Sequence, residues 1–313
     1  MVRPCGCETS KKKLNMAIRI ATAPVSWGIL EIEGWTWRKT YNEVLDEMVQ
    51  AGYSGTELGP HGFLPTNPSE LKRELGKRKL SLLGAFLPLP LAHAERYQAG
   101  LESALEVIRL LADAGAPILV LADSMDPHRM DIAGSVTEAD SLSDEQWKRA
   151  AELVNTVALR AREHGLRSAF HHHAGSYVET PRELDRLLTL TDPHLIGICL
   201  DTGHYFYGGG DPVECVRAQG KRVWHLHLKD IQPEVLAEVR RAKIPYLDAV
   251  GRGVFCELGQ GAVDLVGVIH ELELAGFDGW GVFEQDVDPA LAGPNPLESA
   301  VRSRAYLKTA AGV

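Results

Sequence analysis

Four short stretches of this chain carry potential metal ligands directly after strand-like apolar runs. The four residues are His171, Asp201, His227 and Glu284. The runs before them are rich in β-branched, aromatic and other apolar residues, and helix-like stretches separate them. A polar ligand at the carboxyl end of successive parallel strands is how a (β/α)8 barrel builds its active site. The pattern therefore predicts that these side chains converge on one site.

Two imidazoles and two carboxylates are donors that suit a divalent transition metal. This set favours Mn²⁺ or Co²⁺, with Zn²⁺ as an alternative, over Ca²⁺ and Mg²⁺, which prefer oxygen ligands. Each residue alone has an ordinary explanation: a satisfied strand-end histidine, an Asp201 that caps a loop, or a Glu284 in an ion pair at the barrel rim. Four of them at matching strand ends favour a metal site. Asp286 and Asp288 are weaker candidates that support the site or face solvent.

Strand alternation brings further polar groups to the same face. Successive side chains of a strand point to opposite faces, so His173 shares the inward face of His171 while His172 faces the helix layer. Lys229 continues the inward face of its own strand and can reach the site. Glu57, at the end of an earlier strand, is another inward candidate, with a structural rim carboxylate as the alternative reading.

Strand and helix signals alternate along the whole chain. The expected strands cover residues 18–23, 55–58, 80–87 and 117–122 and begin again near residues 168, 196, 223 and 281. The expected helices cover residues 40–51, 69–78, 92–114, 144–164, 181–191, 212–219, 263–275 and 297–307, with Ser69 and Ser143 as N-caps. Eight strands, each followed by a helix, predict an α/β protein with a closed parallel (β/α)8 barrel, the TIM barrel fold.

The chain is expected to form one barrel domain, residues 17–313, after a disordered leader, residues 1–16. Two strand-to-helix connections, residues 123–142 and 230–261, are unusually long. Long connections of this kind lie over the active site of a barrel and select the substrate. Residues 233–239 in the second connection have the composition of a short lid helix.

Composition and charge exclude several classes of function. A formal net charge of −9 argues against nucleic-acid binding, which needs a basic surface. No apolar run approaches membrane-spanning length, which predicts a soluble protein with no membrane partner. Cys199, Cys215 and Cys256 fit no zinc spacing and are expected as buried apolar residues in a reducing cytoplasm.

The motifs resemble the xylose isomerase-like barrel superfamily of sugar isomerases, epimerases and dehydratases, over nearly all of residues 18–307. Residues 201–204, Asp-Thr-Gly-His, resemble its Asp-x-x-His motif, which implies that Asp201 binds metal and His204 contacts substrate. Residues 225–230 resemble its next motif, in which the second histidine, here His227, is the ligand. Glu284 matches the final ligand of the family.

Within that superfamily the chain is most similar to the inosose dehydratase family. The strings that carry this resemblance are residues 23–28, 56–59, 171–175, 228–235 and 284–286. The triple histidine that begins at His171 is the most specific of them. Most of the superfamily has a metal-binding glutamate at that position, so this chain departs from the carboxylate pair of a proton-shuttling epimerase.

The resemblance implies loss of water from 2-keto-myo-inositol in myo-inositol catabolism, through a metal-stabilised enediolate and β-elimination of a hydroxyl group. Lys229 and His204 are the expected acid and base, in either order, with Glu57 and His173 in reserve. The partner implied is a small polyol or ketose, and a homo-oligomer is compatible with the family. The alternatives are a metal-dependent sugar epimerase or ketose isomerase, a subunit of an enzyme that cleaves carbon-linked sugars, and a non-catalytic sugar-binding protein.

Overall fold

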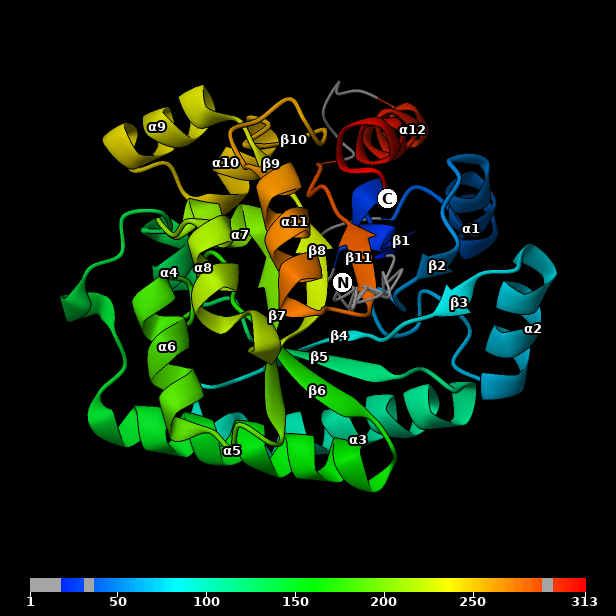
Figure 1. The fold of residues 1–313 in the computed structure, drawn as a ribbon. Helices are drawn as coiled ribbons and strands as arrows, with labels where there is room; N and C mark the ends of the chain where they lie inside the picture. The colour runs from blue at the N-terminus through cyan, green and yellow to red at the C-terminus, as the bar shows by residue number, and fades with distance from the viewer. Residues whose placement is uncertain (1–17, 31–36, 289–294) are drawn as a thin grey trace, which may run out of the picture.

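The computed structural model describes residues 18–30, 37–288 and 295–313, and the predicted leader lies outside these ranges. Its parallel strands curl into a ring, and most of the helices lie around the outside (Figure 1). The strands are β1 (Arg19–Thr22), β2 (Gly55–Thr56), β3 (Ser81–Leu82), β4 (Phe86–Leu89), β5 (Ile118–Asp123), β6 (Arg167–His171), β7 (Ile196–Asp201), β8 (Val223–Leu228), β9 (Asp230–Ile231), β10 (Phe255–Cys256) and β11 (Trp280–Phe283). The predicted TIM barrel fold is confirmed.

The main sheet runs in the order β3-β2-β1-β11-β8-β7-β6-β5-β4. Its two outer strands, β3 and β4, are two pieces of the single strand that the sequence predicted over residues 80–87. Leu83, between β3 and β4, forms hydrogen bonds with the neighbouring strands β2 and β5. The Leu83 amide donates to the Thr56 carbonyl at 3.0 Å, and the Leu83 carbonyl accepts from the Ile118 amide at 3.2 Å. The described sheet is therefore a closed barrel of eight staves, one of which is interrupted.

Gly84 lies at this interruption. A Cβ atom there would lie 2.5 Å from the carbonyl oxygen of Ile118, which no side chain tolerates. The Gly84 carbonyl also accepts a hydrogen bond from the Leu58 amide at 2.9 Å, across the other side of the stave. Glycine therefore allows this stave to approach the next one closely where the barrel closes.

Short-range capping signals fix where the helices begin. Ser143 caps α5 (Asp144–Glu163) as predicted, and its side chain accepts from the Gln146 amide. The predicted cap at Ser69 is wrong. Asn67 caps α2 (Pro68–Arg78), because its side-chain oxygen accepts from the Glu70 amide at 3.0 Å and a proline takes the first helical position. The helices are α1 (Tyr41–Gln50), α2 (Pro68–Arg78), α3 (Tyr97–Ala114), α4 (Pro127–Asp131), α5 (Asp144–Glu163), α6 (Pro181–Leu190), α7 (Thr202–Tyr207), α8 (Pro212–Gln219), α9 (Pro233–Ala242), α10 (Tyr246–Gly251), α11 (Leu265–Ala275) and α12 (Pro296–Tyr306), with 3-10 turns at Pro24–Trp27, Ala94–Arg96, Glu138–Asp140 and Gly220–Arg222 and a π-helical turn at Leu307–Ala311.

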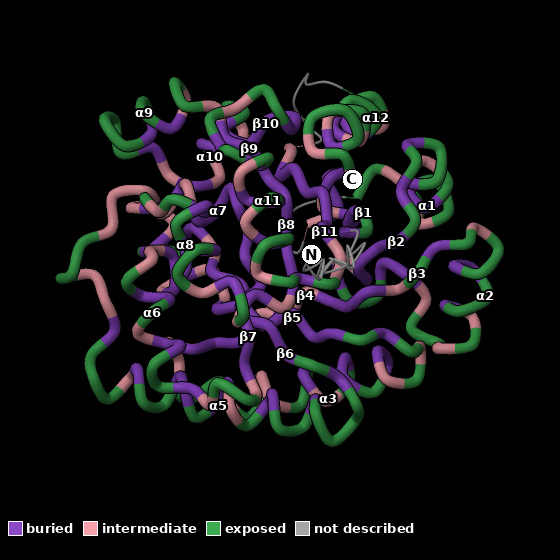
Figure 2. The backbone as a smooth tube through the Cα atoms, viewed as in Figure 1, coloured by how far each residue is buried: buried purple, intermediate pink, exposed green. Residues whose placement is uncertain are grey.

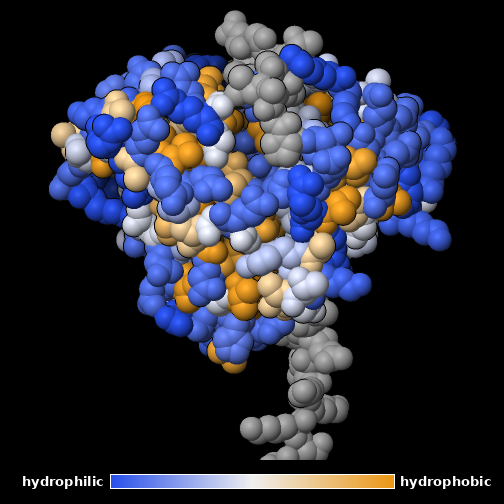
Figure 3. Space-filling model, turned by 90° about the horizontal axis from the view of Figure 1, so that it is seen from above, coloured by the Kyte–Doolittle hydropathy of each residue, from blue (hydrophilic) through white to orange (hydrophobic). Residues whose placement is uncertain are grey.

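The core lies in and around the barrel. Buried residues follow the strands and the inner faces of the helices, whereas the outer faces are exposed (Figure 2). Cys199, Cys215 and Cys256 are buried, as predicted. Viewed from above, the surface is mostly hydrophilic with hydrophobic side chains in several places (Figure 3). Among the described residues, no helix has the length and apolar character needed to cross a membrane.

The two long connections carry short helices that the sequence did not fully reveal. The predicted lid helix is present as α9 and extends beyond residue 239. The same connection also contains α10 and an antiparallel pair, β9 with β10. Residues 202–207 after β7 form the short helix α7 rather than a loop, and Asp201 caps it by accepting from the His204 amide at 2.7 Å.

Substitution of Gly84 by alanine tests the closure of the barrel. The added methyl group would press on the Ile118 carbonyl, so the free energy of unfolding should fall by about 1–3 kcal/mol. Gly76, inside α2, has no atom near its Cβ position, and Gly76→Ala should be neutral or stabilising by up to about 1 kcal/mol. Urea denaturation of both variants compares them. Equal stability would mean that close approach at Gly84 is not required.

Candidate active site

A cavity of about 310 Å³ opens at the carboxyl ends of the barrel strands. Its volume is at the lower end of the range for small-molecule sites. The polar groups on its wall are Glu57, Asp123, Ser124, His171, His173, Lys229, Tyr246, Glu284 and Asp286. Apolar side chains from β4, from residues 25–30 and from α10 complete the wall. The predicted lid helix α9 contributes no side chain to this wall, and α10 takes that place.

The four predicted metal ligands come together at one side of the cavity. Nε2 of His171 lies 3.3 Å from Oδ2 of Asp201. Nδ1 of His227 lies 3.2 Å from Oε2 of Glu284 and 3.8 Å from Oδ2 of Asp201. They come from the ends of β6, β7 and β8 and from the residue after β11, and all four are buried.

These separations suit donors that share one ion. Donors bound at about 2.1 Å from a common metal lie roughly 3.0–3.5 Å from one another. Among the described residues, Nδ1 of His227 is buried and makes no hydrogen bond, which is costly for a polar atom. Burial lowers the pKa of His171, which favours the neutral ring that a metal requires. Burial also opposes the charged form of His227, but Cys199, Glu284 and Glu57 raise its pKa, so a bound cation would displace a proton from this ring. The residues present therefore fit a divalent cation.

Lys229 lies beside the four candidate ligands with its ammonium group surrounded by carboxylates. Its Nζ is 2.9 Å from Oδ1 of Asp286, 3.3 Å from Oε2 of Glu284 and 3.4 Å from Oδ2 of Asp201. Burial disfavours the charged form, but the three carboxylates outweigh it and raise the pKa of Lys229. The ammonium has three hydrogens and three acceptors, so Lys229 is held in its charged form at the cavity wall.

His173 and His204 are fixed by the backbone of one residue. The Ala174 amide donates to Nδ1 of His204 at 3.2 Å, and Nδ1 of His173 donates to the Ala174 carbonyl at 2.7 Å. In their neutral forms, His204 therefore carries its proton on Nε2, whereas Nε2 of His173 is bare. Burial lowers the pKa of both rings, that of His173 to about 4. Only His173 borders the cavity, and His204 lies behind it, 3.1 Å from the Lys229 ammonium.

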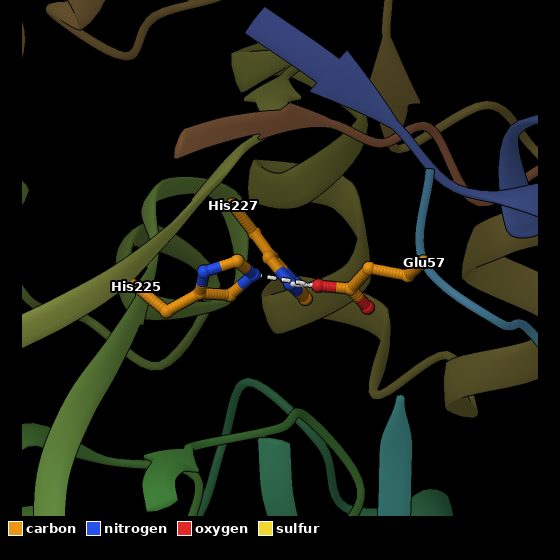
Figure 4. Close-up of side chains that lie close together, drawn as sticks. All are labelled: Glu57, His225 and His227. Carbon is orange, nitrogen blue, oxygen red and sulfur yellow. Dashed lines mark hydrogen bonds and ion pairs between the residues drawn. The ribbon is translucent and has the colours of Figure 1, made fainter. Parts of the chain in front are cut away.

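Glu57 meets two histidines of β8 rather than standing alone as a rim carboxylate. Its Oε1 lies 2.6 Å from Nε2 of His225 and 3.0 Å from Nε2 of His227 (Figure 4). Burial opposes ionisation, but the two imidazoles lower the pKa of Glu57. These are hydrogen-bond lengths, shorter than the spacing of the His171, Asp201 and His227 donors. Glu57, His225 and His227 therefore form a hydrogen-bonded group.

Sequence reasoning undervalued Asp286 and missed Tyr246. Asp286 is buried, binds Lys229, and accepts a hydrogen bond from the Tyr246 hydroxyl at 2.9 Å. The available signal for Asp286 was its position two residues after Glu284, on the same side of an extended chain. Tyr246 gave no such signal, because it lies on α10 in the long connection. His172 faces away from the cavity, as predicted, and packs against Tyr205.

Asp123 is a further cavity residue that the sequence did not indicate. It ends β5, and its two oxygens accept from the Leu91 amide at 3.1 Å and the Tyr177 amide at 2.7 Å. These amides belong to the connections that follow β4 and β6. Burial raises the pKa of Asp123 to about 7. One carboxyl group thus holds two loops against the cavity.

Comparisons with known proteins show the family of the chain and agree with its fold. The model of the xylose isomerase-like TIM barrel family matches residues 45–310. An inosose dehydratase of Geobacillus kaustophilus (strain HTA426) is 34% identical over 281 residues, which cover 88% of this chain and 90% of that protein. The rhizopine catabolism protein MocC of Rhizobium meliloti is 36% identical over 280 residues, which cover 89% of this chain and 85% of that protein. The solved structure of the IOLI protein with a zinc atom has a TM-score of 0.69 at 15% identity, covers 92% of this chain and 95% of that one, and is alike in fold.

The raised pKa of Asp123 predicts a pH-dependent contribution to stability. The folded protein keeps a proton on this group up to about pH 7, whereas the unfolded chain releases it near pH 4. The contribution is therefore complete below pH 4 and is lost as the pH rises towards 7. The stability advantage of the parent over Asp123→Asn should fall across this window, by up to about 1.4 kcal/mol per pH unit. Urea denaturation at four pH values measures it, and a constant difference would contradict the prediction.

Proposed function

This chain belongs to the xylose isomerase-like TIM barrel family, and we propose that it is a metal-dependent dehydratase that removes water from 2-keto-myo-inositol. The family expected from the sequence motifs is thereby confirmed, and curated relatives of the chain are named inosose dehydratase. The single observation that carries the proposal is the position of Lys229. Its ammonium group lines the same cavity as His171 and Glu284, and it lies 3.4 Å from Oδ2 of Asp201 and 3.3 Å from Oε2 of Glu284.

The proposed metal centre uses the residues predicted from the sequence. His171, Asp201, His227 and Glu284 would hold a divalent cation, with Mn²⁺ or Co²⁺ favoured and Zn²⁺ compatible with the same donors. When bound, the cation supplies Lewis-acid polarisation of the substrate ketone and stabilises negative charge on its oxygen. The rest of the reaction requires groups of the chain that move protons.

Dehydration next to a ketone requires one base and one acid. The C–H bond beside the carbonyl breaks and its proton goes to a base. The electron pair forms a carbon–carbon double bond as the neighbouring C–O bond breaks, and the departing hydroxyl takes a proton from an acid and leaves as water. We assign the acid to Lys229, because it lines the cavity and the neighbouring carboxylates hold its ammonium group charged and in a fixed position.

The base is assigned to His173 rather than to His204. The bare Nε2 of His173 can accept a proton, and this ring borders the cavity. His204 lacks contact with the cavity, so its role is to act on Lys229 through Asp286: its protonated Nε2 lies 3.5 Å from Oδ2 of Asp286, and the other oxygen of that carboxylate accepts from Lys229. This assignment revises the order expected from the family resemblance, in which His204 contacts the substrate and His173 is in reserve.

An ultraviolet assay tests the proposed reaction. Protein stripped of metal should leave 2-keto-myo-inositol unchanged, and addition of Mn²⁺ or Co²⁺ should produce the absorbance of a conjugated dione. A changed sugar spectrum by NMR without that absorbance would overturn the dehydratase in favour of an epimerase or isomerase. No metal-dependent change in either signal would overturn the substrate.

Alanine substitutions test the proton-transfer groups. Lys229→Ala and His173→Ala should each lower kcat by about 10²–10⁴-fold, because a positioned acid or base contributes that much. His204→Ala should lower kcat less than either, since its effect passes through Lys229. Lys148→Ala, an exposed lysine on α5, is the matched control and should retain parental turnover. Turnover of the Lys229 and His173 variants within about threefold of the parent would remove this acid and base from the mechanism.

A further inference from the structure

We propose that Glu57 is a positioning residue that holds His227 with Nε2 protonated and Nδ1 free, and so sets the affinity of the centre for a divalent cation. The inference rests on the metal centre of the proposed function. It assigns Glu57 a role different from that of a reserve acid or base. It also specifies Nδ1 as the ligating nitrogen of His227.

The hydrogen-bond geometry determines which nitrogen of His227 carries the proton. Glu57 comes from the end of β2 and His227 from β8, and Oε1 of Glu57 lies 3.0 Å from Nε2 of His227 (Figure 4). An ionised carboxylate only accepts hydrogen bonds, so the proton lies on Nε2 of the ring. In a neutral imidazole, the lone pair is then on Nδ1.

That lone pair points toward the candidate ligands. Nδ1 of His227 is 3.2 Å from Oε2 of Glu284 and 3.8 Å from Oδ2 of Asp201. It is buried, and no described residue forms a hydrogen bond with it. The two nitrogens of His227 thus face two different groups. Nε2 donates a hydrogen bond to the Glu57 carboxylate, and Nδ1 faces the donors that fit a cation.

His225 holds the Glu57 carboxylate in place. Its Nε2 lies 2.6 Å from the same oxygen that accepts from His227, so Oε1 receives two N–H groups (Figure 4). His225 and His227 are two residues apart on β8 and therefore share its inward face. Glu57 is buried, with 2% of its surface exposed, which prevents water from competing for the carboxylate.

Two other roles for Glu57 fit these contacts less well. As a proton carrier, it would have to release an oxygen that already accepts from two buried imidazoles. As a ligand of a second cation, it would need donors farther apart than the 2.6 Å between its Oε1 and Nε2 of His225. A carboxylate that orients a metal-binding histidine explains both distances.

The test measures metal binding rather than turnover. Co²⁺ is titrated calorimetrically into metal-stripped parent, Glu57→Gln and Glu57→Ala, and the absorption of bound Co²⁺ is recorded. Glu57→Ala should bind Co²⁺ about 10–100-fold more weakly than the parent, because loss of such a partner carries that cost. Glu57→Gln, which keeps the size and one acceptor oxygen, should fall between them. Both variants should show an altered visible spectrum of the bound ion.

Glu74→Gln provides the matched control. Glu74 is a buried carboxylate on α2 whose partners are Arg73, Lys77 and Arg78, so its replacement should leave Co²⁺ affinity within about threefold of the parent. Circular dichroism and thermal unfolding of the metal-free proteins select variants that fold. The near-isosteric Glu57→Gln keeps the test valid if Glu57→Ala fails to fold.

The outcomes separate this inference from the proposed function. A parent that binds Co²⁺ while both Glu57 variants bind it equally well would overturn the role of Glu57 and leave the metal centre intact. A parent that binds no Co²⁺ would overturn the metal centre and the inference with it. The inference would also be overturned if the parent bound two equivalents of Co²⁺ and Glu57→Ala bound one. The same holds if ¹⁵N NMR of the zinc-loaded protein showed that His227 binds the ion through Nε2.

Discussion

Four buried carboxylates at one rim of the barrel need positive charge close to them. Glu57, Asp201, Glu284 and Asp286 all contact His227 or Lys229, and each is nearly inaccessible to water. An uncompensated buried charge costs several kcal/mol, so this arrangement is stable only when cations balance it. Lys229 provides one positive charge among three of the carboxylates. Burial opposes a charged His227, but Cys199, Glu284 and Glu57 raise its pKa, so this ring supplies a second positive charge. A divalent cation would balance the negative charge that remains.

Hydrogen bonds to one ring nitrogen of each histidine fix the state of its other nitrogen. The Ala174 backbone makes Nε2 of His173 an acceptor and Nε2 of His204 a donor. Glu57 accepts from Nε2 of His227 and leaves its Nδ1 to face Glu284 and Asp201. Rings of identical chemistry therefore differ in the nitrogen that carries the proton, because each has a different hydrogen-bond partner.

The long connection after β8 closes the cavity because it is anchored at its base. Asp230 is buried, and its carboxylate accepts from four backbone amides, those of Ile231, Gly259, Gly261 and Val263, at 2.8–3.0 Å. Asp230 thus joins the beginning and the end of this connection, directly beside Lys229. α10 lies between these ends and places Tyr246 on Asp286, which in turn binds the Lys229 ammonium. The connection is therefore anchored at Asp230, the residue next to Lys229, and it reaches the Lys229 ammonium through Tyr246 and Asp286.

The sequence by itself determined the barrel and the convergence of His171, Asp201, His227 and Glu284. Strand alternation and the position of a ligand at a strand end are local signals, and a parallel barrel brings all such ends to one rim. Only the tertiary structure decided that Glu57 meets His225 and His227, since that depends on which staves face each other across the barrel. It also decided the break at Gly84 and the place of Tyr246, because close approach between staves and the path of a long connection depend on contacts far apart in the chain.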